Sequence, residues 1–201
     1  MKSFFSMFYT SLKELKSIRC IAITGIFITI SMVIEAFTID LVIFKINFAF
    51  LAIAVIGMLF GPTVGLIAGF ACDIVGFVVH PQGGFIPIYI LVAGLQGLIY
   101  GIVLYHKKDK YTYLLKNNKT DKLTDITLHI RAIVARVIDV VLINILINTK
   151  LNMHYGFIPD EIYIEAVVAR TAKNVLELIV DIPLLFIILP ITLAAYRRLS
   201  K

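Results

Sequence analysis

Residues 169–189 read ARTAKNVLELIVDIPLLFIIL, an apolar run that carries charges in its first half. On a helix, side chains spaced at i, i+3, i+4, i+7 and i+11 share one face. The polar residues with this spacing are Arg170, Lys173, Asn174, Glu177 and Asp181. A polar stripe on a membrane helix is costly unless it faces protein or a water-filled cavity. Two interpretations are open: a site for an anionic or polar solute, or pairing of Arg170 with Asn174 or Glu177 that locks this helix to a neighbour.

The overall composition indicates a membrane protein. Of 201 residues, 60% are hydrophobic and 16% are charged, and the mean hydropathy is +0.94. Soluble domains are about 45–50% apolar and about 25% charged. The net charge of +6 is not accompanied by any nucleic-acid-binding module, so we expect no nucleic acid as a partner. Cys20 and Cys72 give no disulfide framework.

The apolar runs predict an all-α, polytopic integral membrane protein with six transmembrane helices. The expected spans are residues 20–37, 46–60, 63–79, 88–105, 126–147 and 160–196. Residues 1–18 are amphipathic and form a separate N-terminal segment, either an interfacial helix or a disordered basic leader. Residues 19–201 form the membrane domain. Gly25 and Thr29 in the first span are two small residues on one face, which permits close approach of another helix.

The distribution of lysine and arginine predicts the topology. With six spans, both termini and the loops after spans two and four lie on one side, and that side carries most of the cations outside the spans. The opposite side carries only Lys45 and Lys150. Positively charged loops stay inside, so we expect both termini to be cytoplasmic. Polar residues of several segments then converge on the outer half, which favours a solute site: Asp40, Lys45, His80, Gln82, Asn148, His154 and Arg170.

Other polar residues inside the spans need partners, because a lone buried charge is expensive. Arg136 and Asp139 are i, i+3 neighbours that can neutralise each other. We expect Glu177 or Asp181 to pair with a buried cation such as Arg136. Asp73, in the third span, is equally compatible with structural pairing and with a substrate role.

The catalytic motifs searched for are absent. The sequence contains no Walker phosphate loop, no H-E-x-x-H, no G-x-S-x-G and no Cys/His metal spacing. We therefore expect no ATP hydrolysis by this chain, no catalytic residue, no cofactor and no metal. A compact binding protein that takes its energy from partner subunits fits this pattern.

Short motifs along most of the chain point to one family. They are NFAF (47–50), IGMLFGP (56–62), DIVG (73–76), P-x-GGFIP (81–87), GLIYG (97–101), NT-x-L (148–151), YG (155–156) and R-x-x-KN (170–174) with a later Pro183. Across residues 19–196 the sequence resembles the substrate-binding (S) components of energy-coupling factor (ECF) transporters, and most closely the folate type. Gly25-x-x-x-Thr29 occupies the place of the family's Ala-x-x-x-Ala motif, which contacts the coupling subunit.

The resemblance implies a vitamin receptor in a bacterial cell membrane, a transport subunit and not an enzyme. It would bind folate from outside and dock on a transmembrane coupling protein and two cytoplasmic ATPases. Folate is a dianion with a flat pterin ring, so the resemblance implies three kinds of site residue: cations, hydrogen-bonding side chains and aromatic rings. The candidates are Arg170 and Lys173 for the carboxylates or the ring acceptors, Asn144, Asn148, Asn174 and Gln82 for the pterin edge, and Phe85 or Tyr155 for stacking. His80, in the same loop as Gln82, is a further candidate. The alternatives are an S component for pantothenate, thiamin or riboflavin, and a membrane enzyme or assembly factor that uses Asp73, Asp139 and Arg170.

Overall fold

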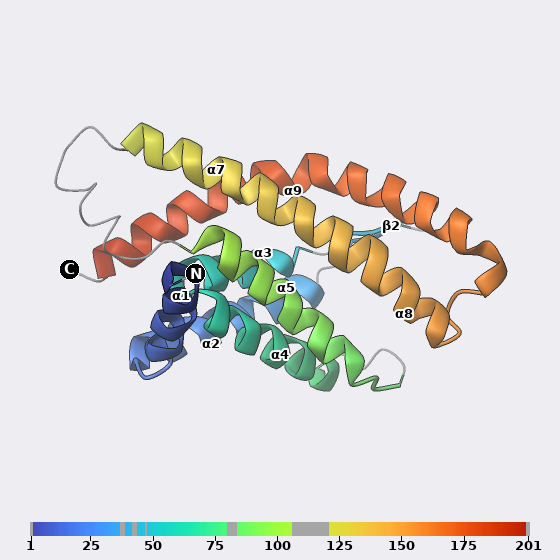
Figure 1. Cartoon of the computed structure of the whole chain (residues 1–201), viewed down its shortest axis with the longest axis horizontal. Helices are drawn as coiled ribbons and strands as arrows, with labels where there is room; N and C mark the ends of the chain where they lie inside the picture. The colour runs from blue at the N-terminus through green and yellow to red at the C-terminus, as the bar shows by residue number, and fades with distance from the viewer. Residues whose placement is uncertain are drawn as a thin grey trace.

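The structure is a computed structural model, and it describes residues 2–36, 39–41, 44–46, 48–79, 84–105 and 121–199. Figure 1 shows the order of the helices and strands along the chain. The elements are α1 (Lys2–Glu14), α2 (Ile18–Ala36), β1 (Ile39–Leu41), β2 (Phe44–Ile46), α3 (Phe50–Phe60), α4 (Pro62–Val79), α5 (Ile88–Leu104), α7 (Asp121–Ile138), the π-helical η1 (Asp139–Ile147), α8 (Asn148–His154), the 3-10 helix η2 (Asp160–Ile162) and α9 (Tyr163–Leu199). The predicted site residues His80 and Gln82 lie outside the described residues, as do the lysines between 107 and 119.

The helical, multi-pass membrane architecture predicted from the sequence is confirmed. α2, α4 and α9 are long and apolar enough to cross a membrane, and α3 and α5 are shorter apolar helices. The predicted span at 46–60 is shorter than expected. Its helix has 11 residues, a length of about 17 Å at 1.5 Å per residue, against a hydrocarbon core of about 30 Å. The strands before it form a short antiparallel hairpin in whose register Asp40 is opposite Lys45.

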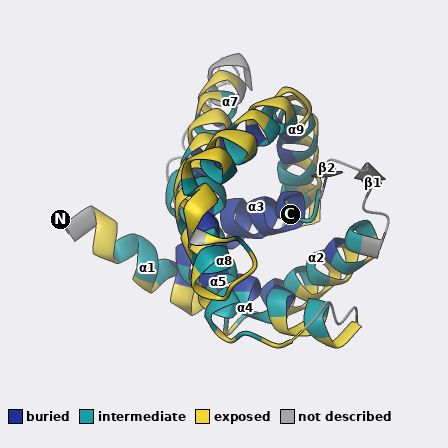
Figure 2. Cartoon of the chain, turned by 90° about the vertical axis from the view of Figure 1, so that its right-hand side faces the viewer, coloured by how far each residue is buried: buried dark blue, intermediate teal, exposed yellow. Residues whose placement is uncertain are grey.

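The short helix α3 is the centre of the fold. Each of its residues is buried, and it contacts α2, α4, α5 and α9. Figure 2 shows this helix buried along its visible length, inside the surrounding helices. Phe60 packs edge-on against Tyr196 of α9, with ring centroids 5.6 Å apart. Because α3 has no polar face, it serves as an apolar axis around which the longer helices are arranged.

Glycines bring α4 and α5 into backbone contact. A Cβ built on Gly97 would lie 2.0 Å from the carbonyl oxygen of Gly65, and one built on Gly65 would lie 2.3 Å from that of Gly97. A Cβ on Gly69 would lie 2.1 Å from the carbonyl oxygen of Ala93. Small residues allow such close approach of membrane helices. The two helices therefore form a rigid pair with no room for side chains at the crossing.

The predicted fifth span is longer than expected and not α-helical throughout. α7, η1 and α8 follow one another without a break and run beside α9 (Figure 1). The nine residues of η1 are π-helical, a conformation that is rare and found mostly at functional sites. This segment brings Asn144 and Asn148 to the face that α9 contacts.

The N-terminal segment is an ordered helix in this structure. α1 packs on the start of α4, where the buried Ser11 hydroxyl accepts hydrogen bonds from the backbone N–H groups of Thr63 (3.0 Å) and Val64 (3.1 Å). The first N–H groups of a helix have no partner within it, so Ser11 caps α4 from a neighbouring helix. The outer face of α1 exposes Phe5 and Tyr9.

Candidate substrate-binding site

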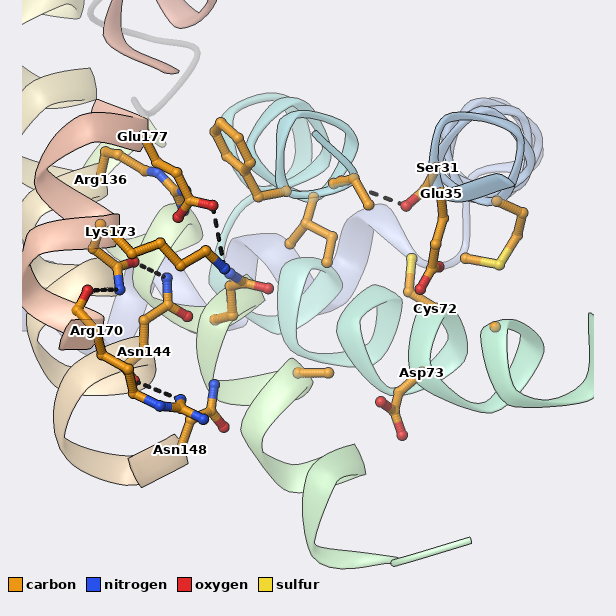
Figure 3. Close-up of a pocket in the computed structure, with 18 residues that line it drawn as sticks. Ser31, Glu35, Cys72, Asp73, Arg136, Asn144, Asn148, Arg170, Lys173 and Glu177 are labelled. Carbon is orange, nitrogen blue, oxygen red and sulfur yellow. Dashed lines mark hydrogen bonds and ion pairs between the residues drawn. The ribbon is translucent and has the colours of Figure 1, made fainter. Parts of the chain in front are cut away.

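A cavity of about 520 Å³ lies between the helices. Two walls face each other in Figure 3, one from α2 and α4 and one from η1 and α9, with residues of α3 and α5 between them. The lining residues are Ser31, Met32, Glu35, Ala49, Phe50, Ile53, Cys72, Asp73, Gly76, Ala93, Gln96, Arg136, Asn144, Asn148, Arg170, Lys173, Asn174 and Glu177. Five of the predicted substrate-binding residues are among them: Arg170, Lys173, Asn174, Asn144 and Asn148.

Hydrogen bonds connect three of these five residues, Asn144, Arg170 and Asn174, across η1 and α9. The Asn144 side-chain N–H₂ donates to Asn174 Oδ1 at 3.0 Å, and Asn174 Nδ2 donates to the Arg170 carbonyl oxygen at 2.8 Å. Arg170 Nη1 donates to the Asn144 carbonyl oxygen at a long 3.4 Å. Asn148 Oδ1 is buried without a hydrogen-bond partner among the described residues. The long contact leaves most of the Arg170 donors available, and Asn148 offers an acceptor beside them.

The two cations that α9 contributes to the cavity, Arg170 and Lys173, differ in their partners. Lys173 Nζ lies 3.4 Å from Glu177 Oε1, one helical turn further on. The structural alternative had Arg170 paired with Asn174 or Glu177. Among the described residues Glu177 pairs with Lys173 instead, and Asn174 binds the Arg170 carbonyl oxygen rather than its guanidinium. The pair of Lys173 and Glu177 is within α9 and does not lock α9 to another helix. The guanidinium of Arg170, by contrast, joins α9 to the η1 backbone through its contact with Asn144.

The deepest charge of the cavity, Arg136, is held between two carboxylates. Arg136 Nη1 lies 2.7 Å from Asp139 Oδ2, and Nη2 lies 2.7 Å from Asp181 Oδ2, with the three side chains at most 4% exposed. The expected pairing of Asp181 with Arg136 is confirmed. Gln96 Nε2 (3.0 Å) and the Tyr100 hydroxyl (3.2 Å) also donate to Asp139 Oδ2. We call Arg136, Asp139 and Asp181 the buried triad.

The buried triad also has an aromatic support that the sequence did not suggest. The Arg136 guanidinium carbon lies 3.8 Å from the centroid of the Phe50 ring, a cation–π arrangement. Every described partner of Arg136 comes from α3, α5, α9 or its own helical run. The triad therefore joins these elements at one point and leaves Arg136 little capacity to bind a ligand anion.

The wall from α2 and α4 carries the opposite charge. Glu35 of α2 and Asp73 of α4 line it, together with Ser31 and Cys72. The Ser31 hydroxyl donates to the Ala49 carbonyl oxygen at 3.4 Å. Glu35 was not among the predicted site residues, although an acidic residue inside a membrane span is itself an indication of function.

The other predicted residues that the structure describes, Phe85, Tyr155, Gly25 and Thr29, are not part of the cavity lining. Phe85 packs against Phe77 with tilted rings whose centroids are 4.9 Å apart, and the Tyr155 ring lies 6.5 Å from that of Tyr89. Both are more than 40% exposed. Gly25 has no atom within 4 Å of a built Cβ, and the Thr29 hydroxyl donates to its carbonyl oxygen at 3.0 Å. The face of α2 that carries Gly25 is thus open.

These features define a class of protein: a polytopic membrane protein with a polar cavity for a solute that carries charges and hydrogen-bonding groups. In the described part of the chain no cluster of His, Cys, Asp and Glu could hold a metal ion. Residues 19–189 match the family model described as ECF transporter, substrate-specific component. The chain belongs to this family of transporter subunits, which confirms the expectation of a transport subunit and not an enzyme.

Two comparisons concern particular proteins. The chain is 33% identical over 95 residues to the folate transporter FolT of Clostridium novyi (strain NT). The match includes 47% of this chain and 55% of the relative, so it spans about half of that protein. The fold is also similar to a crystal structure of FolT bound with folic acid, with a TM-score of 0.66 and 27% identity, over 84% of this chain and 92% of the other.

Proposed function

We propose that this protein is the folate-binding subunit of an ECF-type importer. It captures folate on the outer side of a bacterial cell membrane and docks on a transmembrane coupling protein and two cytoplasmic ATPases that supply the energy. The observation that carries this proposal is the cavity wall of η1 and α9, where Arg170 and Lys173 line the cavity together with Asn144, Asn174 and, from the adjoining α8, Asn148. Such a wall suits a ligand with carboxylates and many ring donors and acceptors.

Arg170 and Lys173 are assigned to the ligand's carboxylates, and Asn144, Asn148 and Asn174 to its polar atoms. Arg170 is well suited because its planar guanidinium can bind a carboxylate through two parallel hydrogen bonds. Lys173 becomes available when a ligand carboxylate takes the place of Glu177, since the present pair at 3.4 Å is loose. The similarity to FolT over a large part of both chains supports folate as the ligand.

The orientation in the membrane is also a proposal. Both termini are assigned to the cytoplasm, which places the Arg170 end of α9 toward the outside. Residues 1–18 are assigned to an interfacial helix on the cytoplasmic side, with exposed aromatic side chains such as Phe5 in the lipid headgroups. Gly25 and Thr29, on an open face of α2, are assigned to the contact with the coupling protein.

The direct test is calorimetric titration of the purified full chain, in detergent, with folic acid, pantothenate, thiamin and riboflavin. We expect saturable binding of folic acid and none of the other three at the same concentrations. Tighter binding of any of the other three vitamins than of folic acid would refute folate as the cargo. Cleavage or other chemical change of folic acid by the purified chain alone would instead support the membrane-enzyme alternative.

A further inference from the structure

The two long walls of the cavity carry charges of opposite sign. Arg170 and Lys173 are on α9, while the residues contributed by α2 and α4 include Glu35 and Asp73 and, among those described, no lysine, arginine or histidine. Figure 3 shows the two sets on opposite sides of the cavity. Any elongated ligand that fills this cavity meets an anionic surface at one end and a cationic surface at the other.

The acidic wall is formed by the close packing of α2 on α4. A Cβ built on Gly76 would lie 3.5 Å from Glu35 Oε2 and 3.6 Å from the sulfur of Met32. Gly76 is three residues after Asp73, so both positions are on one face of α4. The carboxylate of Glu35 therefore reaches the same stretch of α4 that carries Asp73, and both line the cavity there.

The charges at the other wall are already partly balanced. Arg136 is paired with Asp139 and Asp181, and Lys173 is paired with Glu177. Two further carboxylates in the same cavity would repel the carboxylates of a dianion and attract N–H donors. The acidic wall is thus unsuited to the glutamate end of folate.

We infer that Glu35 and Asp73 form the subsite for the donor edge of a 2-amino-4-oxopyrimidine ring, and that they orient the ligand with its glutamate toward α9. This inference rests on the proposed function. The edge of such a ring presents an N–H and an amino group side by side, which match the two oxygens of a carboxylate. Met32, which lines the cavity and lies with Glu35 near Gly76, offers an apolar surface to the flat ring.

The test compares folic acid with two ligands that each lack one of its ends. Isothermal titration of the full chain in detergent would use folic acid, pteroic acid (which lacks the glutamate) and p-aminobenzoylglutamate (which lacks the pterin). Glu35→Gln and Asp73→Asn should each weaken folic acid and pteroic acid by about ten-fold or more and leave p-aminobenzoylglutamate within about two-fold. Arg170→Ala should weaken folic acid and p-aminobenzoylglutamate by about ten-fold and leave pteroic acid within about three-fold.

Matched controls separate the loss of a contact in the cavity from the effect of removing any carboxylate or of poor folding. Glu165→Gln removes an exposed carboxylate on the first turn of α9 that does not line the cavity, and it should leave the affinity for all three ligands unchanged. If Asp73→Asn folds poorly, Asp73→Glu keeps the charge and displaces it, and it should still weaken pteroic acid more than p-aminobenzoylglutamate.

The outcomes distinguish failure of the proposed ligand orientation from failure of the proposed function. Equal losses for all three ligands, or a larger loss of p-aminobenzoylglutamate in the Glu35 and Asp73 variants, would overturn the orientation while folate binding by the parent stands. Failure of the parent protein to bind folic acid would overturn the proposed function and this inference together.

Discussion

The buried triad permits a prediction about stability with a defined sign. Arg136 stands between Asp139 and Asp181, at 2.7 Å from each, with the three side chains at most 4% exposed. Replacing Arg136 with methionine removes the cation and leaves two carboxylates without a counter-charge. Breaking a buried ion pair by removing one partner costs about 3–5 kcal/mol, because the remaining charge is still buried.

The same reasoning predicts a smaller effect for Asp181→Asn. This change keeps an acceptor for the Arg136 guanidinium, and Asp139 still neutralises the cation. The loss should be about 1–2 kcal/mol, close to that of one ordinary hydrogen bond, because the acceptor is kept and only its charge is lost. Replacing Arg136, Asp139 and Asp181 together with methionine and leucine should be milder than Arg136→Met alone, since no buried charge is left over.

The assay is thermal unfolding of the ligand-free protein in detergent micelles. For a chain of this size a loss of 1 kcal/mol lowers Tm by about 2–4 °C. Arg136→Met should therefore lower Tm by about 6–20 °C, and Asp181→Asn by about 2–8 °C. A Tm for Arg136→Met within about 2 °C of the parent, or a triple variant less stable than this single variant, would refute the triad as an electrostatic unit.

Three further predictions concern binding, docking and topology. Arg170→Ala should weaken the binding of folic acid by about ten- to a hundred-fold, with little change in the Tm of the ligand-free protein. Arg170→Lys should restore only part of the affinity, because lysine lacks the planar fork of the guanidinium. Normal binding by a destabilised Arg170→Ala would favour the structural role. Gly25→Leu combined with Thr29→Leu should retain folic acid binding and abolish uptake in cells that contain the ATPases, whereas loss of both would indicate a role in folding. In a cysteine-free background, a membrane-impermeant thiol reagent should label a cysteine at Asn152 in intact cells and not one at Lys116; labelling at the second position would refute the proposed topology.

The sequence predicted the helices well where strong signals mark their ends. The expected span at 63–79 is α4 (Pro62–Val79), and the span at 88–105 is α5 (Ile88–Leu104). Each begins next to a proline, which is favoured at the start of a helix because it lacks the N–H that would be unpaired there. The pairing of Arg136 with Asp181 was also predictable, since a buried cation needs a nearby carboxylate.

Two parts of the site could not be predicted from the sequence. Nothing in the residues of η1 distinguishes a π-helix from an α-helix, because both retain the same apolar composition and differ only in hydrogen-bond register. The acidic wall depends on Glu35 of α2 and Asp73 of α4, which are distant in sequence and are brought to one wall only by the packing of α2 on α4 near Gly76. Periodicity describes the faces of single helices, whereas the cavity is a property of their arrangement.

The glycine crossing of α4 and α5 has a consequence for how this protein can change over evolution. Gly65 and Gly97 each contact the partner's backbone, so a substitution at one position cannot be compensated by a smaller residue at the other. Neither can vary without separating the two helices. The wall of η1 and α9 has no such constraint, because side chains rather than backbone atoms line the cavity there. New ligand specificities can therefore arise by substitution on that wall while the crossing is inherited unchanged.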